Sequence, residues 1–308
     1  SESRFLGGDM SLDAASARKA MDRHIGQPLG ISAEAAAEGV IRIAAVTMSN
    51  VVQRVTTERG LDARDFPMVA FGGAGPLHAV LVARELQMPR IIIPNAPGHF
   101  SAYGMLVADL RRDYVNTRFT PLAGFDFAEM NERFDQMEKA GEREIRSAAI
   151  HVGAIRIERG LDMRYVGQEH AVSVDIPIQV FEDKDLVAIK RLFDAVHLKR
   201  YGYSSDNERA EVVSIRTSVS GDMPKPTAAK VAEGTELAPV PPSIRPVYFT
   251  SESGWQDARV YQREDLLAGN RIAGPALVEE YASTTIIFEG DHLEVDAFGN
   301  LVIEVAND

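Results

Sequence analysis

The stretch VAFGGAGPLHA, residues 69–79, is an apolar run that three glycines and a proline interrupt before helix-like sequence resumes. The run PMVAF (67–71) is typical of a buried strand, Pro76 suits the first turn of a helix, and RIIIP (90–94) is typical of a second buried strand. This order predicts a βαβ-like unit. The glycine loop is then either a ligand-binding turn or a tight turn that only packs.

The loop lacks the features of the two common phosphate-binding loops. A P-loop needs a lysine and then a serine or threonine after its glycines, and none follows here. A dinucleotide fingerprint counted from Gly73 would place His78 at its third small position, and the next strand ends in Pro94 and Asn95 instead of an acid. Backbone amides at a helix start can still hold a ligand, so both interpretations of the loop remain open.

Composition indicates a globular protein and argues against several partners. The 308 residues carry a net charge of -12, with 45% hydrophobic and 25% charged residues. No segment is dense in Lys and Arg, so we expect no nucleic-acid partner and no attraction to anionic membranes. There is no cysteine, no signal-peptide pattern and no continuous run of 18 apolar residues, so we expect a cytoplasmic location and no membrane segment.

The remaining elements follow from periodicity. A largely buried helix is predicted between Ser32 and Gly60, and another helix over 101–113. The middle of the chain mixes both patterns, with strands expected at 114–122, 154–168, 170–178 and 211–221 and helices at 125–150 and 183–202.

The expected fold class is α/β and α+β. Six prolines between Pro224 and Pro246 indicate an extended linker, and the short runs rich in Val, Ile, Thr and Tyr beyond it predict an all-β region. The predicted division is a first lobe at 1–119, an α+β domain at 120–222, a Pro-rich linker at 223–245 and an all-β C-terminal domain at 246–308.

Two further groups of residues have both a functional and an ordinary interpretation. His292, Glu294 and Asp296 alternate along a strand, either as metal ligands or as the solvated face of a half-exposed strand, and we expect the latter and no metal. Asp162 and Arg164 either pair beside a substrate or form a structural ion pair, the more common outcome.

Histidines beside the glycine loop pose a similar choice. His78 and His99 either approach a ligand or serve in packing or capping, which we expect of both. No motif identifies a catalytic residue, and the catalytic residues stay unknown.

Several segments, taken together, resemble a known family. They occur in the family's order and span nearly the whole chain: FLGGDMSLD (5–13), VTTERG through LRRD (55–113), LDMRYVGQEH (161–170), RYGY (200–203) and VYQREDLLAGNRIAGPALVEEYASTT (260–285). The sequence resembles hydantoinase A, the family of ATP-dependent hydantoinases and 5-oxoprolinases, which also contains subunits of acetone and acetophenone carboxylases.

The resemblance implies the C-terminal lobe of an actin-like ATPase fold of the sugar-kinase and heat-shock-protein type, with residues 1–119 on the adenosine side. Gly72, Gly73, Ala74 and Gly75 would then contact the adenosine of ATP, because side chains on the first two would occupy the nucleotide's space. The family's D-x-G-G-T-x-x-D element, which places Mg²⁺ and the terminal phosphates, does not occur here. The chain is therefore expected to be a C-terminal portion, inactive without the missing N-terminal lobe.

By the same resemblance, the complete enzyme would use ATP to phosphorylate and then hydrolyse a small cyclic amide of the hydantoin or 5-oxoproline type, with a B-type partner subunit. An ATP-dependent ketone carboxylase subunit is the enzymatic alternative. A non-catalytic subunit-interaction module, with a purely structural glycine loop, is the other.

Overall fold

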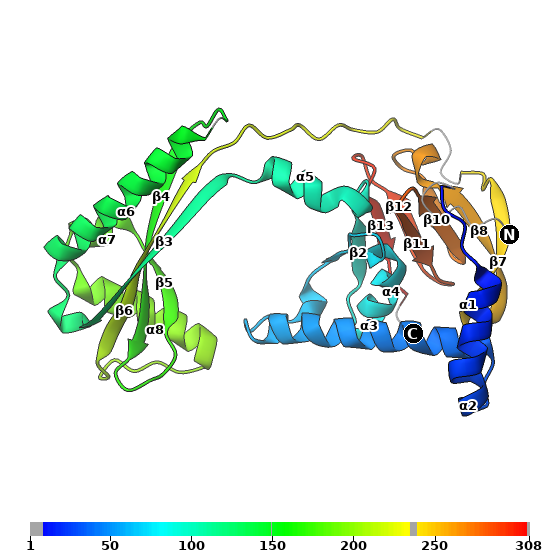
Figure 1. The fold of residues 1–308 in the computed structure, drawn as a ribbon, viewed down its shortest axis with the longest axis horizontal. Helices are drawn as coiled ribbons and strands as arrows, with labels where there is room; N and C mark the ends of the chain where they lie inside the picture. The colour runs from blue at the N-terminus through cyan, green and yellow to red at the C-terminus, as the bar shows by residue number, and fades with distance from the viewer. Residues whose placement is uncertain (1–8, 149, 235–238, 307–308) are drawn as a thin grey trace. The chain divides into compact units, whose positions relative to one another are not determined.

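The computed structural model describes residues 9–148, 150–234 and 239–306, and the chain forms two compact units (Figure 1). The first, called here the split unit, comprises residues 1–104 and 227–308. The second, the inserted unit, comprises residues 105–226. Each is described by itself.

The split unit contains a five-stranded sheet built from both ends of the sequence. Its order is β1-β2-β13-β12-β9. Strands β1 and β2 are parallel, as the predicted βαβ unit requires, and β13 is antiparallel to β2 with Ile303 opposite Ile91. The five strands are β1 (Met68–Val69), β2 (Arg90–Ile93), β9 (Arg271–Ala273), β12 (His292–Val295) and β13 (Leu301–Glu304).

A four-stranded sheet in the order β11-β10-β8-β7 completes the strands of the split unit. Pro246 lies in β7, which pairs on one side only, and an edge strand tolerates a residue without an N–H. The strands are β7 (Ser243–Thr250), β8 (Gly254–Gln262), β10 (Ala276–Glu280) and β11 (Ser283–Ile287).

Helix α4 (Gly75–Glu85) joins the two sheets into one core. Its buried Ala79, Val80 and Ala83 belong to one apolar cluster with Ile91 of β2 and Leu277 of β10. The other helical segments are α1 (Ala14–Met21), a π-helical turn (Asp22–Gly26), α2 (Gln27–Leu29), α3 (Ala33–Thr57), α5 (Phe100–Val107) and short 3₁₀ turns at Ala63–Asp65, Pro97–His99 and Arg263–Asp265.

A buried ion pair links α4 to the end of the five-stranded sheet. Asp291 is completely buried and accepts from Arg84 Nη2 at 3.0 Å. It also accepts from the backbone N–H of Phe288 at 3.2 Å and of Ala306 at 2.9 Å. The Arg84 guanidinium stacks on the Phe288 ring, 5.0 Å from its centroid. Asp291 therefore satisfies three donors from three parts of the chain.

Helix α3 begins where the sequence predicts but is less buried than predicted. Ser32 Oγ accepts from the Ala35 amide at 3.1 Å, which confirms the expected cap. Only Ala33, Ala36, Ala45 and Ser49 are buried, because the helix packs on α4 and β7 along one side. By length and mean hydropathy alone α3 could span a bilayer, a test that core helices of soluble proteins also pass.

The inserted unit is an antiparallel sheet in the order β3-β6-β4-β5 with helices packed on one face. The α6 helix begins at Asp126, which caps its first turn, and rings from two helices meet in the core, with Phe134 and Phe181 centroids 5.1 Å apart. The elements are β3 (Leu110–Pro121), α6 (Phe127–Ser147), β4 (Ile155–Tyr165), β5 (Val172–Ile176), α7 (Ile178–Glu182), α8 (Leu186–Tyr201) and β6 (Ala210–Gly221).

The hydroxyl of one tyrosine in this unit both donates and accepts a hydrogen bond. Tyr165 is buried, donates to Asp194 Oδ1 at 2.6 Å and accepts from the Ser205 amide at 2.8 Å. Burial, followed by the hydrogen bond to Asp194, raises the pKa of Tyr165 to about 12. The hydroxyl joins β4, α8 and the segment after α8.

The helix predicted over 101–113 is wrong in its second half. Helix α5 ends at Val107, and residues 110–113 belong to β3, where they pair with residues 218–221 of β6. A local helical period gives no information on this partner, which lies more than a hundred residues away.

The domain boundaries also differ from the predicted ones. The boundary expected after residue 119 would cut through β3, which pairs with β6 on both sides of a register shift between Thr117 and Thr120. The described residues 246–306 of the predicted C-terminal domain are all-β apart from a 3₁₀ turn, yet they form no separate domain, because β13 pairs with β2. The expected linker at 223–245 is irregular over its described residues up to β7, except for one bridge between Glu233 and Ala268.

Candidate functional site

The glycine loop lies between β1 and α4 and holds one backbone conformation that favours glycine. Gly72 has φ +88° and donates its N–H to the Pro97 carbonyl at 2.8 Å. A Cβ built on Gly72 would have no atom within 4 Å. Backbone conformation, and not crowding, therefore requires a glycine here, and the space on this side of the loop is open.

At Gly73, close packing and not backbone conformation favours a glycine. A Cβ there would lie 3.2 Å from the Ala282 carbonyl oxygen, and a Cβ on Gly98 would lie 3.0 Å from the Ala282 Cβ. The turn between β10 and β11 (281–282) therefore packs closely on the glycine loop and on the turn after β2. Close backbone packing accounts for Gly73 within this chain.

The start of α4 presents amides without a side-chain cap. Ala74 is the N-cap residue at φ -99° and ψ -7°, and its side chain accepts no hydrogen bond; Gly75 and Pro76 follow. Gly73 and Ala74 are both exposed. The positive end of the helix dipole is thus accessible beside bare backbone, an arrangement that suits a polar or anionic group.

Aromatic side chains lie near the loop. Phe71 is 48% exposed, and its ring centroid is 5.2 Å from that of Phe100, which is 5.9 Å from that of Tyr103. Ala96, in the turn that contacts the loop, has φ +53°, a costly conformation for a residue with a Cβ. A strained turn and an exposed aromatic surface therefore flank the bare backbone.

The two histidines near the loop differ in their surroundings. His78 is half-buried in the first turn of α4, and its Nδ1 has no hydrogen-bond partner within the described part of the chain. His99 is exposed and closes the 3₁₀ turn through its backbone N–H to Ala96. No contact described here joins the two side chains.

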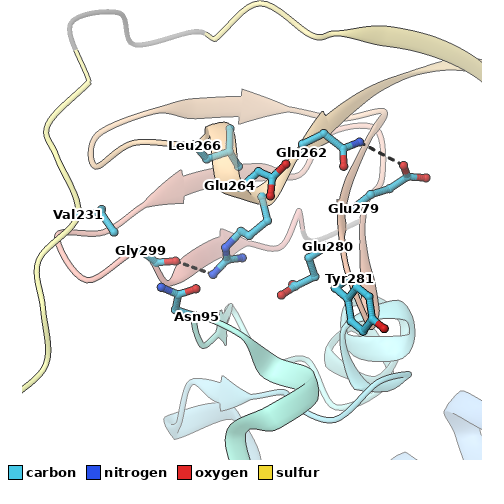
Figure 2. A pocket seen from close by; sticks show the side chains of 10 residues that line it. Asn95, Val231, Gln262, Glu264, Leu266, Glu279, Glu280, Tyr281 and Gly299 are labelled. Carbon is cyan, nitrogen blue, oxygen red and sulfur yellow. Dashed lines mark hydrogen bonds between the residues drawn. The ribbon is translucent and has the colours of Figure 1, made fainter. Parts of the chain in front are cut away.

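A cavity of about 480 Å³ is lined in part by Tyr281, the first residue of the 281–282 turn (Figure 2). Arg263 lines it and is only 8% exposed. Its Nη2 donates to the carbonyls of Ile93 at 3.4 Å, Pro94 at 3.3 Å and Gly299. The lining residues are Asn95, Val231, Gln262, Arg263, Glu264, Leu266, Glu279, Glu280, Tyr281 and Gly299.

Glu280 also lines this cavity and, like Arg263, has a polar atom without a hydrogen-bond partner. Its Oε1 is buried without a hydrogen-bond partner in the described structure, as is Nη1 of Arg263. Burial raises the pKa of Glu280 above its ordinary value of 4.5, and the charge of Arg263 offsets part of that rise. Burial likewise lowers the pKa of Arg263, against the attraction of Glu280 and Asp296.

The other residues singled out from the sequence have structural partners. Asp162 accepts from Ser173 at 2.6 Å and pairs with Arg216 at 3.2 Å, whereas Arg164 pairs with Glu211 at 2.7 Å. The suggested pairing of Asp162 with Arg164 is therefore wrong, because each finds its partner on β6 instead of on its own strand. Both are ordinary ion pairs across the sheet.

The suggested metal set has other partners as well. Glu294 pairs with Arg271 at 3.1 Å, and Asp296 accepts from the amides of Phe298 and Asn300, both at 2.8 Å. No cluster of three acidic or histidine side chains suited to a metal occurs within 9–148, 150–234 and 239–306.

Solved structures first define the class of protein. The chain superposes on the ATP-dependent caprolactamase from Pseudomonas jessenii with a TM-score of 0.83, at 28% identity, covering 99% of this chain and 45% of that one. It superposes on a nucleotide-free acetone carboxylase with a TM-score of 0.73, at 25% identity and the same coverage. The fold is thus a mixed α/β architecture with several sheets, shared with these two enzymes.

Family profiles then make the assignment. The profile described as hydantoinase/oxoprolinase matches residues 1–114, and that of the hydantoinase/oxoprolinase C-terminal domain matches residues 125–304. The chain belongs to the hydantoinase/oxoprolinase family, as its sequence motifs predict.

The curated relatives named next are longer than this chain. It is 37% identical to an uncharacterized protein of Methanocaldococcus jannaschii over 98% of its length and 42% of the relative's. It is 30% identical to the caprolactamase subunit alpha of Pseudomonas jessenii over 95% and 42%. For 5-oxoprolinase 1 of Arabidopsis thaliana the values are 28% identity over 96% and 24%. The chain therefore spans less than half of the length of these relatives.

Proposed function

We propose that this chain supplies the adenosine-binding side of an ATP site in an enzyme that hydrolyses a small cyclic amide. The observation that carries the proposal is the exposed, bare backbone of Gly73 and Ala74 beside the open face of Gly72. Membership of the family, and relatives named as caprolactamase and 5-oxoprolinase, support the cyclic amide as substrate class.

The residues around the loop fit an adenosine group. Gly72 leaves open space, Ala74 and Gly75 start a helix without a side-chain cap, and Phe71 offers an exposed flat ring. We propose that Gly72 to Gly75 hold the ribose and base against backbone in an actin-like lobe. When bound, ATP supplies the phosphoryl group that converts an amide oxygen into a leaving group.

The other half of the site is proposed to come from elsewhere. No three-residue metal cluster occurs within the described ranges, and the sequence has no D-x-G-G-T-x-x-D element. We propose that Mg²⁺ and the terminal phosphates bind to an N-terminal lobe outside these residues, and that a B-type subunit completes ring opening. Relatives named as subunits of caprolactamase and acetone carboxylase support a partner subunit.

Ala74 is a better position than Gly73 for a substitution that tests nucleotide binding. A side chain at Gly73 would disturb the packing on Ala282, so loss of binding in Gly73→Val would have two explanations. Ala74 has an ordinary conformation and an exposed side chain, so Ala74→Leu adds bulk at the loop without internal strain. Ala297→Leu, at an exposed position in the turn after β12, is the matched control.

In the full-length protein, Ala74→Leu is expected to weaken ADP and ATP binding by about tenfold or more in calorimetric titration, since a bulky side chain would occupy the ligand's space. Ala297→Leu is expected to bind both nucleotides like the wild type. Unchanged affinity in Ala74→Leu would refute the adenosine assignment and favour the interaction module.

A carboxylase subunit is the second candidate function, favoured by the acetone carboxylase fold and by 28% identity to the acetophenone carboxylase gamma subunit of Aromatoleum aromaticum. Product analysis on the complete complex, with and without bicarbonate, separates the two reactions. Ring opening without bicarbonate supports the hydrolase, and a bicarbonate-dependent new carboxylate without ring opening would overturn it.

A further inference from the structure

The cavity beside the 281–282 turn contains one buried cation, Arg263, with one terminal nitrogen that has no hydrogen-bond partner in the described structure. All three carbonyl contacts of Arg263 involve Nη2, and Nη1 has no partner in the described structure although the residue is only 8% exposed. The three carbonyls fix the guanidinium in place. An unpaired buried donor is costly, so its presence indicates that something outside the chain pairs with it.

A matching acceptor lies on the same cavity wall. Glu279 is already bonded to Arg245 at 2.8 Å and Gln262 at 3.3 Å, whereas Glu280 Oε1 has no partner among the described residues. Figure 2 shows the Glu280 side chain pointing across the cavity toward Asn95, and Glu279 pointing away from it. No ion pair within 4.0 Å joins Glu280 to Arg263 in the described ranges, so neither Glu280 Oε1 nor Arg263 Nη1 satisfies the other.

The charge of the cavity defines which kind of group pairs with these two atoms. Arg263 is set against Glu264 and Glu280, whereas Glu279 is paired with Arg245, so the cavity wall has no excess of cations to hold a carboxylate or phosphate, and a neutral molecule is favoured. A volume of about 480 Å³ suits a small ring. The free groups are one N–H donor and one carboxylate acceptor.

We propose that the Arg263–Glu280 cavity binds the polar edge of a small neutral molecule that presents a hydrogen-bond acceptor beside an N–H donor. The acceptor receives the hydrogen bond of Arg263 Nη1, and the N–H donates to Glu280 Oε1. A lactam presents this pair through its carbonyl oxygen and its N–H, and an adenine base presents it through a ring nitrogen and its amino group. The choice of ligand rests on the proposed function, which supplies both sources.

The position of the cavity favours a role in that same site. Tyr281 lines the cavity, and the next residue, Ala282, contacts the glycine loop and the turn at Gly98. The 281–282 turn is thus a wall common to the cavity and the glycine loop. Glu280 is two residues before Ala282, whose carbonyl packs against Gly73 of the proposed nucleotide-binding loop.

The test compares ε-caprolactam, N-methylcaprolactam and adenosine by calorimetric titration of the full-length protein. In Glu280→Gln, which keeps the size of the side chain, affinity for ε-caprolactam or adenosine is expected to fall by about tenfold or more, because a charged acceptor is lost. Wild type is expected to bind N-methylcaprolactam about tenfold more weakly than ε-caprolactam, since it has no N–H, and Glu280→Gln should remove that difference.

Glu289→Gln, an exposed carboxylate that does not line the cavity, is the charge-matched control and should bind like the wild type. Arg263→Lys keeps the positive charge and loses Nη1; its melting temperature shows whether it is folded. The ligand whose affinity falls in Glu280→Gln identifies the source: the lactam assigns a substrate site and adenosine a base site.

Binding of ε-caprolactam and of adenosine that is equal in wild type and Glu280→Gln would overturn the inference, as would no binding of either probe to wild type at millimolar concentration. Measurable and equal affinity of wild type for the two lactams would overturn the lactam assignment. The proposed function is judged separately by nucleotide binding in Ala74→Leu. If Ala74→Leu weakens nucleotide binding and Glu280→Gln leaves the binding of both probes unchanged, the proposed ATP site stands and only the proposed cavity ligand is refuted.

Discussion

Replacing Asp291 with asparagine tests how α4 is held to the five-stranded sheet. The carboxylate is completely buried and accepts from Arg84 Nη2 at 3.0 Å and from two backbone amides. Asparagine keeps one acceptor oxygen and turns an NH₂ group toward the remaining donors. Breaking a buried pair on one side costs about 3–5 kcal/mol, because the partner charge stays behind.

The whole unit is expected to be stable by only about 5–15 kcal/mol, so this loss is large. At roughly 2–4 °C per kcal/mol, the melting temperature of the split unit should fall by about 6–20 °C. Scanning calorimetry and urea unfolding measure the change. Glu294→Gln, which removes the exposed pair with Arg271, is the control and should cost at most about 1 kcal/mol. A loss below 1 kcal/mol in Asp291→Asn would refute the reasoning.

Three further substitutions have expected outcomes. Because the pKa of Glu280 is raised, its contribution to the free energy of unfolding is fully present below pH 4.5 and is lost as pH rises through the shifted pKa. In urea unfolding, Glu280→Gln should lose less free energy of unfolding than wild type over this pH range. An identical pH dependence of the two proteins would contradict this. Tyr165→Phe removes one of the donors to Asp194, which keeps Lys190, and leaves the Ser205 amide without its acceptor, so it should cost about 1–3 kcal/mol in urea; spectrophotometric titration should find this phenol titrating near pH 12. Gly141→Ala places a Cβ 2.7 Å from Val219 and should destabilise by about 1–2 kcal/mol, since overpacking outweighs the gain in helix propensity; a higher melting temperature would count against it.

Local patterns predicted much of the fold, and distant pairings account for the errors. VAFGGAGPLHA and RIIIP place β1, α4 and β2 correctly, because burial and turn residues act over short ranges. Residues 110–113 were predicted as helix since their strand partner lies at 218–221. Alternation along β13 shows which side chains are buried but not that β2 is the neighbouring strand.

Only the glycine loop of the candidate site could be predicted from the sequence, because its glycines mark an unusual backbone. The glycines of the loop are visible in the sequence, although Gly73 turns out to be required by contact with Ala282. No sequence motif singles out Arg263 or Glu280, because their burial depends on strands that are distant in the sequence. The available signal was their place within the long family-like segment 260–285, between short apolar strands.

The pairing of β2 with β13 bears on how the chain matures during synthesis. Arg90 and Glu304, which face each other across this pair, are 214 positions apart, so β2 leaves the ribosome long before its partner exists. The inserted unit has all four strands within residues 105–226 and can fold first, whereas β1 and β2 form only a marginal two-stranded sheet with an open edge. Nascent chains arrested before β13 emerges should therefore carry a protease-resistant inserted unit behind a split unit that still depends on chaperones.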